Sequence, residues 1–577
     1  MRLLILTVLY LQCASAFFCS SLKDEDWWKT ATFYQIFTKS FKDSNGDGIG
    51  DIQGILDKLD YIKNLGVTGV WLTSFFRSPE KDNGYDVSNH TDINPALGDL
   101  DTFQKFLNEA HKKRLKVIID FIPNHTSDQH DWFNKSMNRE DEYTDFYVWL
   151  KDDNTTGPPN NWVSNFNGSA WQWNDQRNQY YLHQFLPEQP DLNYRNNYVR
   201  NIMKDILTYW LKTQGVDGVR IGSVPYLIEE QVFKDEPVSK RHPNATESDY
   251  EYLNHVFTVN QPESYDLVYE WRAHVDKISS ITGQTKICIC EATQPTDKII
   301  PYYGSRAGTK QGAHFAFNFI LDLELKATSN AKDLANLIGE WLNKLPKIYV
   351  SNWVLGSHDF HRVATRLGRE RVDLLNMLTG FLPGIQITYY GEEIGMEEVN
   401  ECAQLHQSNA SDCYVYKGDS RDPQRTPMQW DSSPLANFSD GKTTWLPVSY
   451  KKNQCNVKDQ EEDPKSHLNV YRSVQNLRTQ LRTQDQMEMK VLDKHNNILE
   501  LTRYNKGESQ GSRINVFIMV LNFGGEPVTV PLTADPPFKV MLRSGNSLRK
   551  CGEMIKAKIL TMQPYEALIL KPKYTSN

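Results

Sequence analysis

The stretch Leu115-Lys-Val-Ile-Ile-Asp-Phe-Ile-Pro123 is a short apolar run, rich in β-branched residues, that ends where polar residues begin. Runs that are hydrophobic on both faces are typical of strands in a parallel sheet covered by helices. Seven further runs share this pattern, each followed by a helical stretch: Thr32–Phe37, Val67–Leu72, Val216–Gly222, Lys286–Glu291, Phe315–Leu321, Trp353–Asp359 and Ile385–Tyr390. Eight such units predict an α/β fold, a closed parallel (β/α)₈ TIM barrel, whose reactive residues lie at the C-terminal ends of the strands.

Two further parts interrupt or follow the predicted barrel. About ninety residues separate the third and fourth runs, many more than one helix requires. The excess predicts a small inserted domain, and its tryptophans are expected mainly to pack that domain, with a sugar-stacking wall as the alternative: Trp132, Trp149, Trp162, Trp171 and Trp173. Alternating strands after residue 483 (Ile498–Tyr504, Ile514–Asn522, Glu526–Pro531 and Pro564–Leu570) predict a C-terminal antiparallel β-sandwich domain. The predicted order is therefore a signal peptide (1–16), barrel (17–125), inserted domain (126–193), barrel (194–483) and β domain (484–577).

The ends of the chain predict export. Arg2, the apolar run Leu3–Leu11 and the small residues Ala14-Ser-Ala16 form the pattern of a signal peptide, and the run is too short to span a bilayer. A secreted, extracellular protein without a membrane anchor is the prediction. Eight N-x-S/T sequons predict a glycoprotein, although Asn124 lies in a motif placed at the barrel mouth: Asn89, Asn124, Asn134, Asn154, Asn167, Asn244, Asn409 and Asn437.

The charge of the chain indicates which binding partners to expect, and its cysteines indicate a candidate disulfide. The net charge of −8 is spread along the chain without a basic cluster, so nucleic acid is not an expected partner. Cys402 and Cys413 bracket a short polar loop and are the candidate disulfide. Cys288 and Cys290 lie in an apolar strand and are expected to be buried.

Four polar motifs fall at ends of predicted strands: Asp120-Phe-Ile-Pro-Asn-His-Thr-Ser-Asp-Gln-His130, Gly218-Val-Arg-Ile-Gly-Ser-Val-Pro225, Ile289-Cys-Glu-Ala292 and Gly356-Ser-His-Asp359. They resemble the four consensus regions of the α-amylase superfamily. Tyr390-Gly-Glu-Glu-Ile-Gly-Met396 and Ser420-Arg-Asp-Pro-Gln-Arg-Thr-Pro-Met-Gln-Trp-Asp431 resemble its α-glucosidase branch. The whole most resembles the secreted maltases of insects, over nearly all of the mature chain, and this implies α-glucoside sugars as ligands.

The resemblance implies a role for each residue of the site. A retaining glycosidase uses one carboxylate as nucleophile and one carboxylic acid on the other face of the sugar. By resemblance Glu291 is the acid/base and Asp359 stabilises the transition state. The remaining positions imply a sugar pocket suited to terminal glucose, with a first subsite and a closed far end: His125, Arg220 and His358, then Asp82, Tyr85 and Arg421.

The nucleophile is missing. The family reads G-F-R-I-D-A-V-P where this chain has Gly222, and glycine has no side chain with which to attack carbon. Three alternatives stay open. The first is Ser223 as a substitute nucleophile, although its side chain is expected to point away from the pocket because strand side chains alternate. The second is direct attack by water, which would need activation by Asp359, whose implied role is different. The third is an allele or a sequencing error, since a single-base change converts an Asp codon to a Gly codon.

Further departures from the family pattern surround the same motifs, and several are expected to flank the sugar: Ser357, Phe360, His361, Phe37, Thr38, Lys39, Thr73 and Ser74. They resemble the result of relaxed or redirected selection after catalysis was lost.

A separate segment, Asp43-Ser-Asn-Gly-Asp-Gly-Ile-Gly-Asp51, alternates oxygen-bearing residues with glycines. Such a loop can wrap a hard cation, and the alternative is a solvated turn. The family resemblance favours a structural Ca²⁺ site at Asp43, Asn45, Asp47, the carbonyl of Ile49 and Asp51.

Three functions are weighed. The first is a secreted, catalytically disabled α-glucosidase homologue that binds α-glucosides or an unidentified protein partner. The second is a working α-glucosidase that acts on maltose or sucrose. The third, an ancillary subunit of a membrane transporter, is disfavoured because no membrane-spanning helix is predicted before the barrel.

Overall fold

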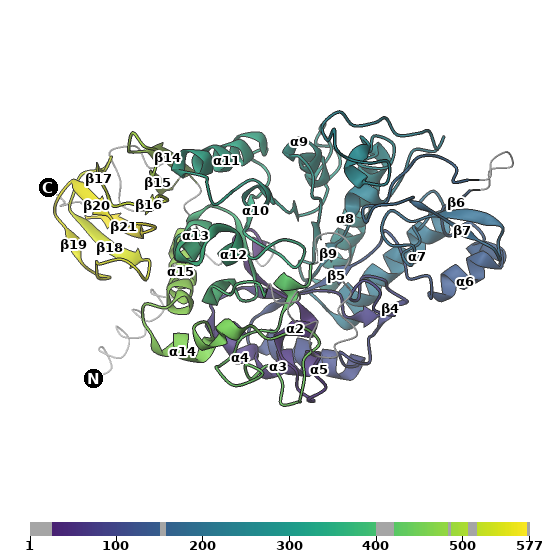
Figure 1. Cartoon of the computed structure of the whole chain (residues 1–577), viewed down its shortest axis with the longest axis horizontal. Coiled ribbons are helices and arrows are strands. Elements are labelled where there is room, and N and C mark those ends of the chain that lie inside the picture. The colour runs from purple at the N-terminus through teal and green to yellow at the C-terminus, as the bar shows by residue number, and fades with distance from the viewer. Residues whose placement is uncertain (1–25, 151–156, 400–420, 483–485, 506–515, 574–577) are drawn as a thin grey trace, which may run out of the picture.

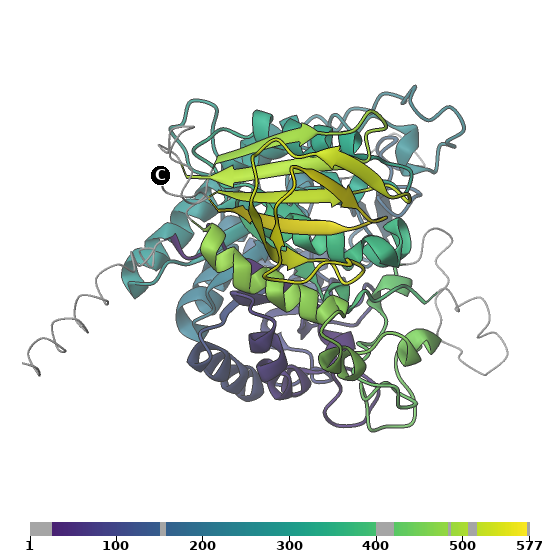
Figure 2. The ribbon, with the colours of Figure 1, turned by 90° about the vertical axis from the view of Figure 1, so that its left-hand side faces the viewer.

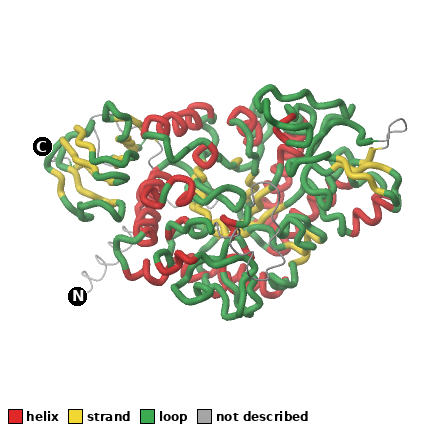
Figure 3. The backbone as a smooth tube through the Cα atoms, viewed as in Figure 1, coloured by secondary structure: helices red, strands yellow, loops and turns green. Residues whose placement is uncertain are grey.

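The computed structural model describes residues 26–150, 157–399, 421–482, 486–505 and 516–573 (Figure 1). Eight parallel strands form one sheet at the centre of the larger part of the molecule, and helices surround it (Figure 3). The strands follow the order β11-β10-β9-β5-β2-β1-β13-β12. They are β1 (Thr32–Ile36), β2 (Gly69–Leu72), β5 (Lys116–Phe121), β9 (Gly218–Ile221), β10 (Ile287–Cys290), β11 (Phe315–Ala316), β12 (Asn352–Val354) and β13 (Ile385–Tyr389). The predicted barrel is therefore confirmed.

The sixth strand is shorter than its apolar run. The run Phe315–Leu321 predicts a strand throughout, but β11 ends at Ala316 and Ile320–Leu323 forms the short helix α10. The side chain of Asn318 accepts a hydrogen bond from the backbone N–H of Ile320 at 3.2 Å, which turns the chain out of the sheet. Apolar residues continue past the turn because α10 packs on the barrel, so hydrophobicity alone does not mark the strand end.

Side-chain amides close the seam between β11 and β12. These strands are not paired in the sheet order, but Asn352 donates to the carbonyl of Ala316 at 2.7 Å, and Asn318 donates to the carbonyl of Asn352 at 3.0 Å. Both asparagines are buried. They satisfy backbone groups that a ladder would otherwise pair.

The helices that cover the barrel include four long ones with one buried face, α5 (Leu100–Lys112), α7 (Asn197–Thr208), α8 (Pro262–Thr282) and α11 (Ala331–Lys344). The others are α2 (Thr38–Phe41), α3 (Ile52–Asp57), α4 (Leu59–Asn64), α9 (Thr296–Ile299), α12 (Val363–Leu367), α13 (Val372–Phe381), α14 (Val457–Glu462) and α15 (His467–Leu481). A two-stranded sheet of β3 (Phe76–Arg77) and β4 (Asn89–Ile93) follows β2.

The predicted insertion contains its own small sheet. Helix α6 (Asp131–Met137) and the order β6-β8-β7 lie within it, with β6 (Trp149–Leu150), β7 (Trp171–Asn174) and β8 (Gln179–Leu182). Trp162 and Trp171 are buried in a separate core with Leu182, so these two rings pack the insertion. An unpredicted loop between β9 and α8 covers this core, because Trp162 donates its indole N–H to the carbonyl of Lys234 at 2.8 Å.

The C-terminal part is an antiparallel sheet at the opposite end of the molecule from β6 and β7 (Figure 1). The six-stranded order is β14-β15-β16-β21-β18-β19, and a pair of strands, β17-β20, packs against it. The strands are β14 (Gln486–Val491), β15 (Ile498–Tyr504), β16 (Phe517–Asn522), β17 (Val528–Pro531), β18 (Phe538–Arg543), β19 (Met554–Ile555), β20 (Ile559–Met562) and β21 (Ala567–Pro572).

Figure 2 shows this sheet face on, with α15 running beside it. The guanidinium of Arg503 on β15 donates to the carbonyls of Phe381 at 2.7 Å and Leu481 at 2.9 Å, the last residues of α13 and α15. The predicted C-terminal β domain is confirmed, while its exact limits and those of the insertion stay predictions.

Several predictions concern export and modification. The predicted signal peptide (1–16), the Cys402–Cys413 pair, and the sequons at Asn154 and Asn409 lie outside the described residues. Cys288 and Cys290 are buried, as expected. Asn124 is buried as well, whereas four other sequons are exposed: Asn134, Asn167, Asn244 and Asn437. Within the described ranges, no helix has the length and apolar character needed to cross a bilayer.

Candidate active site

A cavity of about 380 Å³ opens at the C-terminal ends of the barrel strands. This volume is in the usual range of small-molecule sites. All of the predicted sugar-site residues line it: Asp82, Tyr85, His125, Arg220, Gly222, Glu291, His358, Asp359 and Arg421. Parallel strands bring these distant segments together because all their C-terminal ends meet at one rim of the barrel.

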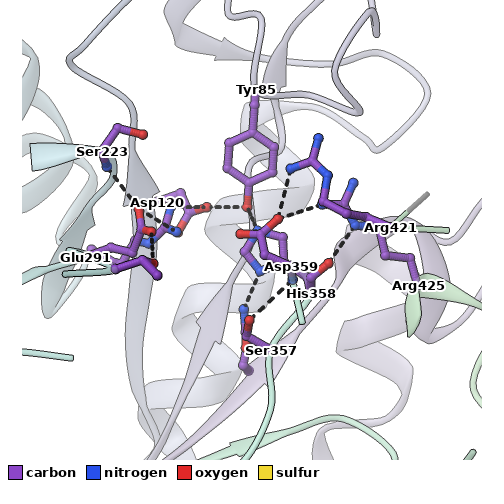
Figure 4. A network of polar contacts seen from close by, with 12 residues as sticks. Tyr85, Asp120, Ser223, Glu291, Ser357, His358, Asp359, Arg421 and Arg425 are labelled. Atoms are coloured by element: carbon purple, nitrogen blue, oxygen red, sulfur yellow. Dashed lines mark hydrogen bonds and ion pairs between the residues drawn. The ribbon is translucent and has the colours of Figure 1, made fainter. Parts of the chain in front are cut away.

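The predicted acid, Glu291, comes directly after β10 and is held from one side. One carboxylate oxygen accepts a hydrogen bond from the backbone N–H of Ser223 at 2.9 Å (Figure 4). The same oxygen lies 3.3 Å from Nη2 of Arg220. The carboxyl group therefore faces the segment where the family carries its nucleophile.

Gly222 comes directly after β9 and is buried. Its backbone is outside the left-handed region, so the conformation does not require glycine. A Cβ atom at this position would lie 3.0 Å from Nη1 of Arg220 and 3.7 Å from its Cζ. The guanidinium thus occupies the edge of the space that a side chain at position 222 would need.

Asp120 is a buried carboxylate at the floor of the site that the sequence reasoning quoted but did not assign. It accepts hydrogen bonds from the indole of Trp71 at 2.6 Å, the hydroxyl of Tyr85 at 2.8 Å and Nη1 of Arg220 at 3.3 Å. Burial raises the pKa of Asp120, and the charge of Arg220 opposes that shift. Its position at the end of a strand run is the signal that could have placed it in the site.

Two arginines hold Asp359. Nη1 of Arg421 donates to one carboxylate oxygen at 2.9 Å, and Nη2 of Arg425 donates to the same oxygen at 2.8 Å. Burial alone would raise the pKa of Asp359, but the positive charges of Arg421 and Arg425 more than offset it and hold the pKa well below its usual range. Arg425 was not predicted as a site residue, although it lies in the quoted α-glucosidase motif.

The histidine beside Asp359 is fixed on both ring nitrogens. His358 Nδ1 and the amide of Gln35 lie 2.8 Å apart, and His358 Nε2 lies 2.7 Å from the hydroxyl of Tyr85. The rings of Tyr85 and His358 also stack, with centroids 5.3 Å apart. Burial lowers the pKa of His358 well below its ordinary value, so the ring is neutral. Gln35, on β1, is a further positioning residue that no predicted motif contained.

The far end of the cavity closes around a bridging arginine. Nη2 of Arg421 donates to Asp82 at 2.6 Å, so this one side chain joins Asp82 to Asp359. The amide of Gln189 from the insertion donates to the other oxygen of Asp82 at 3.1 Å and lies 3.1 Å from Nε2 of His125. Burial lowers the pKa of His125 to about 4, which leaves this histidine neutral as well.

The chain matches the family described as "Alpha amylase, catalytic domain" over residues 35–486. The chain belongs to the alpha-amylase family. Among curated relatives, a salivary alpha-glucosidase of Aedes aegypti is 43% identical over 528 residues, 88% of this chain and 88% of its own length. Maltase A2 of Drosophila melanogaster is 40% identical over 570 residues, 95% of either chain. The resemblance to insect maltases is thereby confirmed.

Solved structures of enzymes that act on sugars have a similar fold. The α-glucosyl transfer enzyme XgtA is 30% identical, with a TM-score of 0.82 over 94% of this chain and 99% of its own. An inactive variant of the trehalulose synthase MutB, with two aspartates replaced, was solved in complex with isomaltulose; it is 27% identical, with a TM-score of 0.78 over the same shares. A further relative, the human amino acid transporter heavy chain SLC3A1, is 37% identical over 577 residues, 99% of this chain and 82% of its own length.

The strand alternation expected at Ser223 does not extend to this residue. Strand β9 ends at Ile221, and Ser223 has a left-handed backbone (φ 56°) at the start of a 3-10 turn, Val224–Tyr226. Because the strand has ended, side chains no longer alternate, and Ser223 is one of the residues that line the cavity. Its backbone N–H, however, is already used to hold Glu291.

Most of the departures from the family pattern lie beside the cavity wall rather than on it. Thr38 donates its hydroxyl to the carbonyl of Thr73 at 3.2 Å, and Thr73 accepts from the backbone N–H of Thr38 at 3.2 Å. Lys39 pairs with Glu80 at 2.8 Å. Only Phe360 of this set is among the described residues that line the cavity.

The five insertion tryptophans do not line the described cavity either. The insertion reaches the sugar site instead through Phe166 and Phe185, which the sequence reasoning missed. The guanidinium of Arg421 lies 5.3 Å from the ring centroid of Phe166, a cation–π distance.

The acidic loop 43–51 folds on its own hydrogen bonds. Asp43 accepts from the backbone N–H groups of Asn45, Gly46 and Gly48 at 2.8–3.0 Å, and Asp51 caps α3 by accepting from Gly54 at 2.7 Å. These are hard oxygen donors of the kind that Ca²⁺ prefers. In the part of the chain that the structure describes, however, no three His, Cys, Asp or Glu side chains gather as a metal site. Calcium binding stays a prediction.

Proposed function

We propose that this maltase-like member of the alpha-amylase family is a secreted glycoprotein that binds α-glucosides, with hydrolysis lost or severely reduced. The observation that carries the proposal is Gly222, which lies beside Arg220, the partner of Glu291, at the position where a retaining glucosidase needs a carboxylate. Loss of a covalent nucleophile costs ~10⁴–10⁶ in rate in other hydrolases.

The other carboxylates of the cavity are already engaged. Asp359 is held by Arg421 and Arg425, and Asp82 is held by Arg421 and Gln189. Asp120 lies under the floor, fully buried, with partners on both oxygens. A substitute nucleophile would have to leave these contacts, so we expect no second carboxylate to replace the missing one.

Sugar binding draws on groups that remain in place. The neutral histidines, Tyr85 and the Arg421 bridge present hydrogen-bonding groups and ring faces to the cavity. The inactive MutB variant that holds isomaltulose supports the view that a catalytically dead site of this family still binds sugar.

A working α-glucosidase, acting on maltose or sucrose, is the second candidate. Its support is that the insect relatives are named alpha-glucosidase or maltase and that every predicted site residue except the nucleophile lines one cavity. An ordinary glucosidase rate would require a nucleophile other than residue 222.

The test compares three proteins purified from culture medium: the native chain, Gly222→Asp and Gly222→Asn. Hydrolysis of maltose, sucrose and 4-nitrophenyl α-glucoside is measured, together with binding of a non-hydrolysed maltose analogue by calorimetry. We expect the native chain and Gly222→Asn to bind the analogue without appreciable turnover, and Gly222→Asp to gain ~10⁴-fold or more in kcat/KM.

Gly222→Asn is the matched control because asparagine has the size of aspartate without its negative charge. Ordinary glucosidase turnover by the native chain would favour the second candidate. Absence of binding in the native chain would remove the sugar-binding part of the proposal. Appearance of the protein in the medium with its first residue at position 17 would support export.

A further inference from the structure

The side chain of Arg220 is a buried cation with an unused donor. Only 3% of the residue is exposed, and its Nε has no hydrogen-bond partner among the described residues. Its other nitrogens reach Asp120 and Glu291 at 3.3 Å, at the long end of the hydrogen-bond range. A buried donor without a partner is unfavourable. A group that could accept from this guanidinium would therefore be stabilised here.

The space next to this guanidinium is open to the cavity. Gly222 offers no side-chain atoms, and beyond its two chain neighbours the nearest atoms to a Cβ built there are Nη1 and Cζ of Arg220 at 3.0 Å and 3.7 Å and the carbonyl oxygen of Phe121 at 3.8 Å. Arg220, Gly222, Ser223 and Glu291 all line the same cavity. A small ligand can enter this space from the cavity and meet a fixed positive charge.

We propose that the space beside Gly222 is a binding site for a small monovalent anion, such as formate or azide, and that the bound anion acts as the nucleophile on an α-glucoside in the cavity. This inference rests on the proposed sugar binding. Arg220 supplies the charge that attracts the anion, and the absent side chain supplies the room. The protein would then be an α-glucosidase that depends on an external anion.

The chemistry balances for both anions. An oxygen of formate forms a bond to the anomeric carbon from the face of Gly222, the bond to the leaving group breaks, and the leaving group departs with the electron pair. Water then displaces formate from the anomeric carbon and loses its proton to the carboxylate of Glu291, so that glucose and formate are released. Azide forms a carbon–nitrogen bond instead, and the β-glucosyl azide leaves as the product.

Protonation of the leaving group by Glu291 is not needed for every substrate. Glu291 lies beside Arg220, and an anion bound there would compete for the same guanidinium. Fluoride leaves without help from an acid, so α-glucosyl fluoride tests the attack by the anion separately from proton donation. The first experiment therefore uses this substrate.

Fluoride release from α-glucosyl fluoride is measured for the native chain and for Gly222→Asn, with formate, azide or chloride at equal ionic strength. We expect formate and azide to raise the rate of the native chain at least ~10-fold in a saturable manner, and azide to yield β-glucosyl azide by mass spectrometry. Gly222→Asn fills the space without adding a nucleophile, so its rate should not respond.

A second readout does not depend on sugar. Formate and azide should raise the Tm of the native chain above its value in chloride, and should leave the Tm of Gly222→Asn unchanged. Sugar binding by calorimetry without any anion response in rate or Tm would overturn the anion site and leave the proposed function standing. A Tm response without sugar binding would keep the anion site and overturn its role as nucleophile together with the proposed function.

Discussion

At the scale of single residues, the contacts of Arg220 explain why one missing side chain matters. Arg220 lies on β9 and Gly222 comes directly after this strand, and both residues line the cavity. The guanidinium now approaches Asp120 and Glu291 and borders the space left at Gly222. The missing side chain therefore leaves the guanidinium of Arg220 at the edge of the space beside Gly222.

Arg421 gives a prediction at this scale. Its guanidinium bridges Asp82 and Asp359 with two separate nitrogens, which a lysine ammonium on a single flexible stem cannot reproduce. We expect Arg421→Lys to weaken binding of the maltose analogue ~10- to 100-fold by calorimetry. Arg77→Lys, which changes an exposed ion pair with Asp92, is the matched control. Equal affinity of the two variants would show that the bridge does not shape the sugar site.

Some residues of the site could be located from the sequence, and others could not. Glu291 and Asp359 end apolar runs and His125 follows one closely, so the barrel rule, together with the family resemblance, placed all three at the site. Gln35 and Gln189 carry no such signal, since one is inside a strand and the other in the insertion. Strand alternation did not apply to Ser223 because β9 ends at Ile221, two residues before it.

At the scale of elements, the side-chain amide of Asn352 is one of the two that close the seam between β11 and β12. Asn352 donates to the carbonyl of Ala316 and the hydroxyl of Tyr303, and accepts from the backbone N–H of Asn318 at 2.8 Å. We expect Asn352→Ala to lower the free energy of unfolding by about 2–3 kcal/mol, because it leaves buried partners unsatisfied. The measurement is the free energy of unfolding of Asn352→Ala from a urea titration, with the exposed Asn343→Ala as the control variant. Equal midpoints for both variants would contradict the role of the seam.

The apolar runs of the sequence predicted the strands of the barrel but not the side-chain amides that join β11 to β12. Six of the eight apolar runs end within two residues of the end of their strand, because a strand buried on both faces is hydrophobic throughout. The runs that begin at Phe315 and Trp353 continue five residues past the ends of β11 and β12. The run at Phe315 failed because α10 is buried too, and apolar content does not separate a buried helix from a strand.

The acidic loop before α3 carries the calcium prediction. If its oxygens bind the ion, millimolar Ca²⁺ will raise the Tm of the native chain, since a ligand that binds only the folded state stabilises it. Asp47→Asn should reduce the increase, because it removes one of the charged oxygens. The exposed Asp57→Asn on α3 is the control and should respond like the native chain. No Tm change with Ca²⁺, or the same change with Mg²⁺, would favour a solvated turn.

At the scale of the whole molecule, buried carboxyl groups lie where the insertion, the loop after β9 and the barrel meet. Asp191 of the insertion accepts from Asn124 at 3.1 Å and from Gln184 at 2.8 Å. Glu229, on the loop, is buried nearby, and the guanidinium of Arg195 donates to its carbonyl. Titration of such groups changes the stability of the whole chain rather than of one loop.

Glu229 sets the direction of this pH dependence. Burial raises its pKa to about 7, while a backbone hydrogen bond and the charge of Arg195 lower it and Glu263 raises it. Because the folded state holds this proton more tightly than the unfolded state, the stabilising contribution is complete below pH ~4.5 and is lost as the pH rises through 7. The loss amounts to about 3 kcal/mol at most.

We therefore expect Glu229→Gln, which is neutral at every pH, to lose less stability between pH 5 and pH 8 than the native chain does. The measurement is the free energy of unfolding from urea titrations followed by tryptophan fluorescence at the two pH values. Glu251→Gln, on the exposed surface of the same loop, is the control and should keep the native pH dependence. If Glu229→Gln and the native chain lose the same free energy, the carboxyl group is ionised throughout, and the pH dependence must come from other buried acids.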